Sequence, residues 1–189
     1  MNEKNTNKIK FGLKNVHYAT ITDTDGVITY GTPKRIPGAV SLVLNPKGEK
    51  SEFYADDMAY FVQTANQGYE GTLEIALIPD EFRIDVLKDK VDKNGWLFEN
   101  AEAVSVPIAL LYEFSGDAKA TRHVNYNVTV ARPSVEGGTK TATIEPKTET
   151  LNITAAPAPD TRDVKGRALV GQEGYDTFYD AVGTFEPIE

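Results

Sequence analysis

Short runs in which hydrophobic and polar residues alternate make up most of this chain. The alternation is clearest at residues 104–114, 124–130 and 151–155, where every second residue is apolar. Successive side chains of a β-strand point to opposite faces of its sheet, so each run predicts a strand with one apolar face. Threonine and asparagine occupy many of the alternate positions, which favours sheets that keep one face in contact with water.

The first half of the chain also consists of short strand-like runs, with clearer turn residues between them. Strand-like runs surround Asp25 and Gly26, a dipeptide typical of a two-residue β-hairpin turn. Residues 39–44 form another apolar run, and residues 72–77 alternate again. A long span, residues 45–66, separates these two runs.

One segment has the periodicity of a helix. Pro79 and Asp80 form a start signal, and Gly95 is a natural stop. The apolar residues that would share one side of this helix are Phe82, Val86, Leu87 and Val91. We therefore predict one α-helix at about residues 80–93.

Together these elements predict a mainly β protein, an antiparallel β-sandwich or split barrel with one flanking α-helix. Residues 1–10 are polar and rich in asparagine and lysine, whereas residues 157–189 begin with the stiff sequence PAPD and are weakly patterned. We interpret both as extended terminal arms beside a β-sandwich domain at residues 11–156. At 189 residues, the chain is long enough to bury one substantial core.

Composition argues against several classes of protein. The chain has no cysteine, so it has no disulfide framework, thiolate metal site or cysteine nucleophile. Its first residues lack the apolar core of a secretory signal, and no run approaches the roughly 20 apolar residues that a membrane span needs. We expect a soluble protein with no membrane partner.

The negative charge of the chain is concentrated in one window. The net charge is −8, and seven acidic residues but no lysine or arginine lie within residues 51–82. Proteins grip nucleic acid mainly through Lys and Arg, so this window argues against tight binding to a phosphate backbone.

The window contains the adjacent pair Asp56 and Asp57, which could be an acid–base pair or a charged surface tip. Neighbouring residues of a strand face opposite ways, so they are poor partners for shared acid–base chemistry, and we favour the tip. Residues 23–26 resemble the opening of a calcium loop but lack its later ligands, which favours a hairpin turn. His17 and His123 lack partners at catalytic or metal-ligand spacing, so we predict no catalytic and no metal site.

An ordered set of sequence segments across residues 8–185 closely resembles the major tail protein of long, flexible-tailed bacteriophages of Gram-positive hosts. The segments are structural motifs rather than catalytic signatures, and their number and order make the resemblance specific. They are KIKFGLKNVHYA, GAVSLVLNPKGEKSEFYADD, NQGYEGTLEIALIPDEFRIDVL, ALLYEFSGD, RHVNYNVTVARPS and EPKTETLNITAAP.

The resemblance implies a structural virion protein with no enzymatic activity and no cofactor. Such proteins form hexameric rings that stack into the tail tube, which encloses the tape-measure protein and conducts DNA into the host. Their partners are other copies of themselves, the tape-measure protein, and the tail terminator and distal tail proteins. DNA passes through the lumen without specific binding. The expected location is the tail of the virion, after assembly in the host cytoplasm.

The resemblance also gives the acidic window a role, because a wall that repels phosphates lets DNA slide. The candidate acidic lumen surface consists of Glu52, Asp56, Asp57, Glu70 and Glu74. In related tubes a long loop or hairpin touches the next ring. The candidate ring-stacking loop consists of Lys47, Glu49, Lys50, Phe53, Tyr54, Asp56, Asp57 and Tyr60.

Two other classes of protein stay open. A tube protein of a contractile injection or type VI-like secretion system is a near relative, which genomic context and the presence of a sheath would separate. A carbohydrate-binding or hydrolytic β-sandwich is more distant, and it would bind its ligand as a monomer rather than form rings.

Overall fold

A computed structural model describes residues 11–117, 119–139 and 147–184. It confirms the prediction of a mainly β protein, because nine strands form one large antiparallel sheet. These strands are β1 (Leu13–Thr24), β2 (Val27–Tyr30), β3 (Lys34–Arg35), β4 (Ala39–Pro46), β7 (Tyr69–Ile75), β10 (Ile108–Phe114), β11 (Arg122–Val130), β12 (Glu149–Ala156) and β13 (Lys165–Ala168). Two separate antiparallel pairs complete the described strands: β5 (Lys50–Ala55) with β6 (Met58–Thr64), and β8 (Lys90–Val91) with β9 (Leu97–Phe98).

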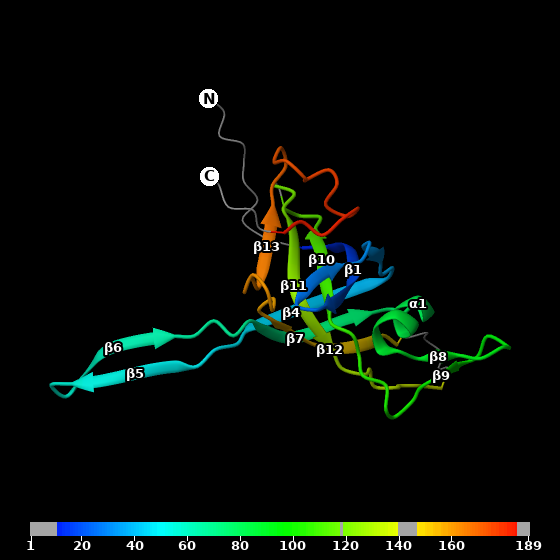
Figure 1. Cartoon of the computed structure of the whole chain (residues 1–189), viewed down its shortest axis with the longest axis horizontal. Coiled ribbons are helices and arrows are strands. Elements are labelled where there is room, and N and C mark those ends of the chain that lie inside the picture. Colours follow the sequence, from blue (N-terminus) through cyan, green and yellow to red (C-terminus); the bar gives the residue numbers. More distant parts are fainter. Residues whose placement is uncertain (1–10, 118, 140–146, 185–189) are drawn as a thin grey trace.

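The sheet follows the order β2-β1-β10-β11-β12-β7-β4 and divides at β11. The first half of β11 pairs with β13, whereas its second half pairs with β12. In Figure 1, β10, β11 and β13 run across the direction of β4, β7 and β12. The sheet therefore bends, and its two parts enclose the main hydrophobic core.

The main core is built from the apolar positions of alternating strands. Leu73 and Ile75 of β7 and Leu151 of β12 are almost fully buried, together with Leu110 of β10. Their neighbours along β7 and β12 point away from this core, as the period-two pattern predicts. The helical segment covers this core through Phe82, whose ring packs edge-on against Tyr18 with centroids 5.0 Å apart.

A second hydrophobic cluster covers the opposite face of β10 and β11. Ala109 and Leu111 of β10 are fully buried, because Phe178 and its neighbours in the C-terminal segment pack over them. The expectation of one wet face is therefore wrong for β10, all of whose residues are buried except its half-buried last one, Phe114. Residues 157–184 lie against the sheet, with β13 as an added strand.

Arg122 of β11 anchors the C-terminal segment to the sheet. Its guanidinium lies 4.0 Å from the ring centre of Tyr175 and 4.9 Å from that of Tyr179, and it donates a hydrogen bond to the Tyr175 carbonyl. Its Nε also lies 3.3 Å from the carboxylate of Glu113, a buried residue of β10 that Asn15 also contacts. One cation thus holds two aromatic rings and a buried carboxylate together.

The helix begins where the sequence predicts but ends earlier. The α-helical turn α1 (Asp80–Phe82) continues into one π-helical turn, η1 (Arg83–Leu87). Lys88 then adopts a left-handed conformation (φ 62°), which turns the chain into β8. The predicted end near residue 93 is therefore wrong, and Val91 lies exposed in β8. The predicted core residues Phe82, Val86 and Leu87 are buried.

Strands β4 and β7 belong to one long hairpin that begins inside the sheet and leaves it. They pair from Ala39 with Ile75 to Pro46 with Tyr69, and the chain then continues into β5 and β6. The two parts are joined by backbone hydrogen bonds from Gln67 N–H to the Lys47 carbonyl (2.9 Å) and from Lys47 N–H to the Gly68 carbonyl (2.8 Å). Figure 1 shows the outer part as a two-stranded ribbon that projects away from the body.

Gly68 lies at the point where this hairpin leaves the sheet, and we predict that Gly68→Ala destabilises the protein by about 2–4 kcal/mol. The residue has φ 100°, and an added methyl group would overlap the carbonyl oxygen of Ala155 on β12. Urea unfolding monitored by circular dichroism would measure the loss. The control is Gly137→Ala, where the methyl group meets nothing within 4 Å. Equal losses in the two variants would contradict this explanation.

Candidate assembly surfaces

The ribbon formed by β5 and β6 is the most exposed regular structure among the described residues. Every residue of β6 is exposed, and so are five of the six residues of β5. Asp56 and Asp57 form the two-residue turn at its tip, with φ angles of 51° and 58°. Positive φ at both central residues is the geometry of a type I′ hairpin turn, so the acidic pair closes a β-hairpin at a surface tip.

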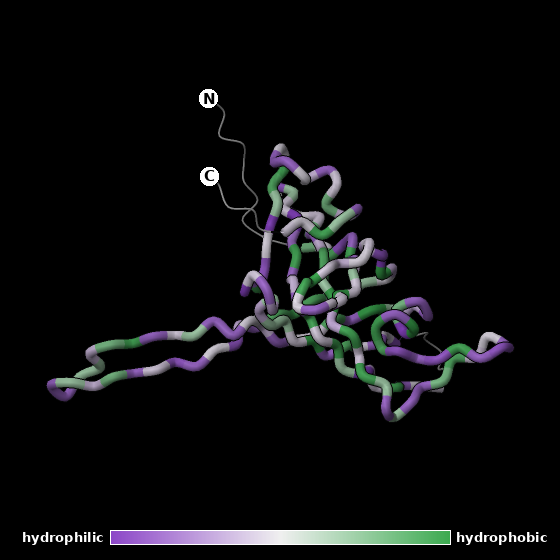
Figure 2. Tube along the Cα trace, in the orientation of Figure 1, coloured by the Kyte–Doolittle hydropathy of each residue, from purple (hydrophilic) through white to green (hydrophobic). Residues whose placement is uncertain are grey.

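Large apolar side chains lie along both strands of the ribbon. Tyr60 is 72% exposed, and Figure 2 shows hydrophobic residues on the ribbon far from the body. The other large exposed side chains are Phe53, Tyr54, Met58, Phe61 and Val62. Soluble monomers rarely expose so many apolar side chains together, and such a patch usually marks an interaction site.

The pairing of the strands sorts these side chains onto two faces. Phe53 lies directly opposite Phe61, so the two rings share one face of the ribbon. Glu52 is on the other face, where its carboxylate accepts a hydrogen bond from Tyr54 and pairs with Lys50. These contacts lower the pKa of Glu52, with Lys50 the larger cause. The ribbon therefore has an aromatic face and a charged face.

The structure places all of the predicted ring-stacking residues on the ribbon or at its base. Phe53 and Tyr54 lie on β5 and Tyr60 on β6, with Asp56 and Asp57 between the strands. Lys47, Glu49 and Lys50 lie at or near the base of the ribbon. The resemblance had implied a loop or a hairpin here, and the structure shows a hairpin.

The predicted lumen residues do not lie together. Glu52, Asp56 and Asp57 are on the ribbon, whereas Glu70 and Glu74 are on β7 within the main sheet. Glu70 and Glu74 point away from the core, on the side opposite Leu73 and Ile75. The acidic window of the sequence thus corresponds to separate surfaces.

Glu70 and Glu74 belong to an outward face that we call the polar face. Its positions on β11, β12, β7 and β4 carry two carboxylates, no lysine and no arginine. These positions are Asn127, Thr129, Thr150, Asn152, Thr154, Glu70, Thr72, Glu74, Ser41, Val43 and Asn45. The side chain of Thr148 (2.6 Å) and that of Ser41 (2.9 Å) donate hydrogen bonds to Glu74, and these bonds lower its pKa. The carboxylate is therefore held in its charged form.

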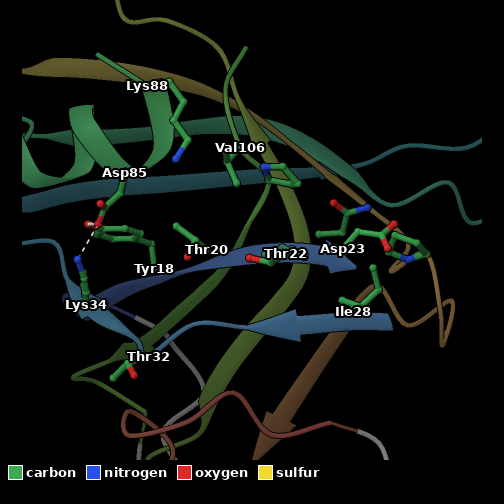
Figure 3. Close-up of a pocket in the computed structure, with 14 residues that line it drawn as sticks. Tyr18, Thr20, Thr22, Asp23, Ile28, Thr32, Lys34, Asp85, Lys88 and Val106 are labelled. Carbon is green, nitrogen blue, oxygen red and sulfur yellow. Dashed lines mark hydrogen bonds and ion pairs between the residues drawn. The ribbon is translucent and has the colours of Figure 1, made fainter. Parts of the chain in front are cut away.

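A groove of about 750 Å³ opens between β1, β2 and the helical segment (Figure 3). The hydroxyl of Tyr18 donates to Asp85 (3.0 Å), and Lys34 donates to both Asp85 and Glu81 (2.7 Å each). Burial and the hydrogen bond to Asp85 raise the pKa of Tyr18. Burial raises the pKa of Asp85, but the hydrogen bonds from Lys34 and Tyr18 outweigh it, so the pKa of Asp85 is lowered. These charged groups bind one another, an arrangement typical of a structural network.

The other candidate residues take part in a turn and in ring contacts within the described part of the chain. Asp23 accepts a hydrogen bond from the backbone N–H of Gly26 (2.9 Å), which confirms the hairpin turn. The imidazole of His17 stacks on Tyr179, and that of His123 stacks on Tyr112. No group of three or more His, Asp or Glu side chains in this part of the chain is arranged to hold a metal ion. No helix among these residues is long and apolar enough to cross a membrane.

No protein-family model matches the chain, and no curated protein matches it.

One exposed surface, at the β8–β9 hairpin, was not predicted from the sequence. Trp96 lies exposed there, whereas an aromatic residue that follows a helical segment more often packs against a core. The available signal was the group of lysines just before it, Lys88, Lys90 and Lys93, which is typical of a surface segment.

We predict that the body of the protein does not depend on the ribbon for stability. In a ribbon-less variant, residues 48–66 are replaced by Asn-Gly, so that the bond from Gln67 N–H to the Lys47 carbonyl closes a type I′ turn. Because the ribbon is exposed and lies outside both hydrophobic clusters, the melting temperature should change by less than about 4 °C. Calorimetry would measure it, and a drop of about 10 °C or more would show that the ribbon supports the core.

Proposed function

We propose that this protein is a tail-tube protein of a long-tailed bacteriophage, which forms hexameric rings that stack into a hollow tube. The observation that carries this proposal is the projecting ribbon, with aromatic side chains exposed on both of its strands. The proposal includes a fold of the tail-tube type, a place in the tail of the virion and assembly in the host cytoplasm.

The ribbon supports assembly because it has little to stabilise it within one chain. An isolated two-stranded hairpin is only marginally stable in water, and a third strand or a packing partner is usually needed. Here both faces of the ribbon are open, and six large apolar side chains are exposed. Contact with another copy would cover them, and repeated contacts between identical chains produce rings and filaments.

The polar face supports the second part of the proposal, a lumen through which DNA passes. Its Thr and Asn side chains offer no fixed positive charge, and its carboxylates, Glu70 and Glu74, repel phosphates. Lys47, at the base of the ribbon, lies 3.8 Å from Glu70 and offsets part of that charge. A surface of this kind does not retain DNA by counterion release. In the tube this face would meet the tape-measure protein first and the genome later, and the tail terminator and distal tail proteins would close the two ends.

The proposed protein has no enzymatic activity and needs no cofactor. The competing functions make different predictions about assembly. A type VI-like tube protein would also form rings, and a sheath partner would separate it from a phage tail protein. A carbohydrate-binding protein would use a pocket as a monomer, and the groove beside Tyr18 is the first place to look for such binding.

We predict that the purified protein forms rings or tubes at high concentration in negative-stain electron microscopy and sediments with them. The ribbon-less variant should fold but remain unassembled. The variant Asp56→Lys with Asp57→Lys should form fewer or shorter tubes, because it reverses the charge of the tip. A wild-type protein that stays monomeric at every concentration would contradict the proposed function, and normal tubes from the charge-reversed variant would contradict the role of the tip.

We predict that Glu70→Lys with Glu74→Lys gives tubes that retain DNA. Reversing two charges on the polar face of every subunit should raise the amount of short DNA that sediments with the tubes by about tenfold at low salt. The control is Glu173→Lys with Asp176→Lys, the same charge change at exposed positions of the C-terminal segment. Equal DNA retention by the two variants would contradict the lumen assignment, as would a tube structure with Glu70 and Glu74 on its outer wall.

A further inference from the structure

The β8–β9 hairpin presents a second exposed aromatic surface. Its turn is organised by Asp92, whose Oδ1 accepts the backbone N–H groups of Asn94 and Trp96 (2.8 Å each). The bond from Trp96 is the largest cause of a lowered pKa for Asp92, so the carboxylate stays charged inside the turn. This arrangement holds the hairpin in a defined shape while its aromatic side chains remain uncovered.

Trp96, Phe98 and Lys90 lie on one face of this hairpin. Trp96 is 67% exposed and stacks on Phe98, with ring centroids 6.4 Å apart. Lys90 is paired directly opposite Phe98, which places both side chains on the same side. Tryptophan is the residue most typical of energetically dominant interface positions, so a rigid, uncovered Trp–Phe pair is an unusual feature for a free surface.

This aromatic face is accompanied by positive charge. Lys90 and Lys93 are exposed, and neither takes part in an ion pair with any other described residue. The nearby acids are already engaged: Asp92 binds the turn, and Glu99 pairs with Arg132 (3.0 Å). The surface therefore offers two lysines to an outside partner.

The β5–β6 ribbon has the complementary properties. It combines the aromatic pair Phe53 and Phe61 with the carboxylates of Asp56 and Asp57, and neither carboxylate has an ion-pair partner among the described residues. Figure 1 shows the two hairpins at opposite ends of the longest axis of the molecule. They therefore cannot meet within one chain, but the end of one copy can meet the opposite end of the next.

We propose that the β8–β9 hairpin is the acceptor for the β5–β6 ribbon of a second copy of this chain. The ribbon's aromatic face packs on Trp96 and Phe98, and its acidic tip lies beside Lys90 and Lys93. This contact is heterologous, so it repeats from copy to copy and generates a ring or a filament, according to the rotation between neighbouring copies. Pairing of two ribbons tip to tip would instead bring four carboxylates together, which like-charge repulsion opposes. The inference rests on the proposed function, because it names the acceptor for the same ribbon.

Intermolecular disulfide cross-linking would test this contact, because the chain has no cysteine of its own. One variant carries Met58→Cys, at an exposed position of the ribbon, and the other carries Asn94→Cys, at an exposed position of the β8–β9 turn. We expect a disulfide-linked heterodimer when the two are mixed and oxidised with diamide, and little homodimer from either alone. Adding Lys90→Glu and Lys93→Glu to the second variant should lower the yield about tenfold. Adding Asp56→Lys and Asp57→Lys to the first should then restore it.

The emission of Trp96 gives a second measurement that uses the unmodified protein. It is the single tryptophan of the chain, so a shift of emission to shorter wavelength on assembly would report its burial. Tubes that form with no cross-link and no emission shift would overturn the acceptor while leaving the proposed function intact. Cross-links without tubes would support the contact and count against the tube. Efficient cross-linking of the Met58→Cys variant with itself alone would overturn the acceptor in favour of paired ribbons.

Discussion

The pairing of β4 with β7 is the constraint on which the rest of the molecule depends. Leu42 lies opposite Leu73 in this ladder, and burial of Leu73 and Ile75 fixes its register. A slip of one residue would turn these side chains to water and bring Glu74 into the core, at a cost of several kcal/mol. Because the same two strands continue outward, the core sets the starting register of the ribbon as well.

Much of the fold could be predicted because its signals are local. Alternation identified the strands at residues 124–130 and 151–155, and Asp25-Gly26 identified its turn. The strand predicted at residues 104–114 begins only at Ile108, and Val104 before it is exposed. The burial of both faces of β10 was not predictable, since the covering residues lie about 70 positions further along the chain. The end of the helix was missed because Lys88 ends it in a left-handed conformation, a position that glycine or asparagine usually occupies.

The candidate surfaces could be predicted only in part, because composition reports which charges are near in sequence and not which face they share. The acids of residues 51–82 form one window in the sequence but occupy the ribbon, the polar face and the helical segment in space. The aromatic residues around Asp56 resemble a buried strand in composition. Their exposure follows from the length of the hairpin, which carries them beyond the reach of the core.

The ribbon also has a mechanical consequence. About ten residues separate its base from its tip, which at about 3.4 Å per residue gives an arm of about 30 Å. A rotation of about 10° at the base would move the tip by about 5 Å, while the pairing along the arm stays intact. Two bodies joined through such an arm can tilt relative to each other without losing their contact. In the proposed assembly the ribbon would act as a compliant joint, and a column of these subunits would bend at its joints while each body stays rigid.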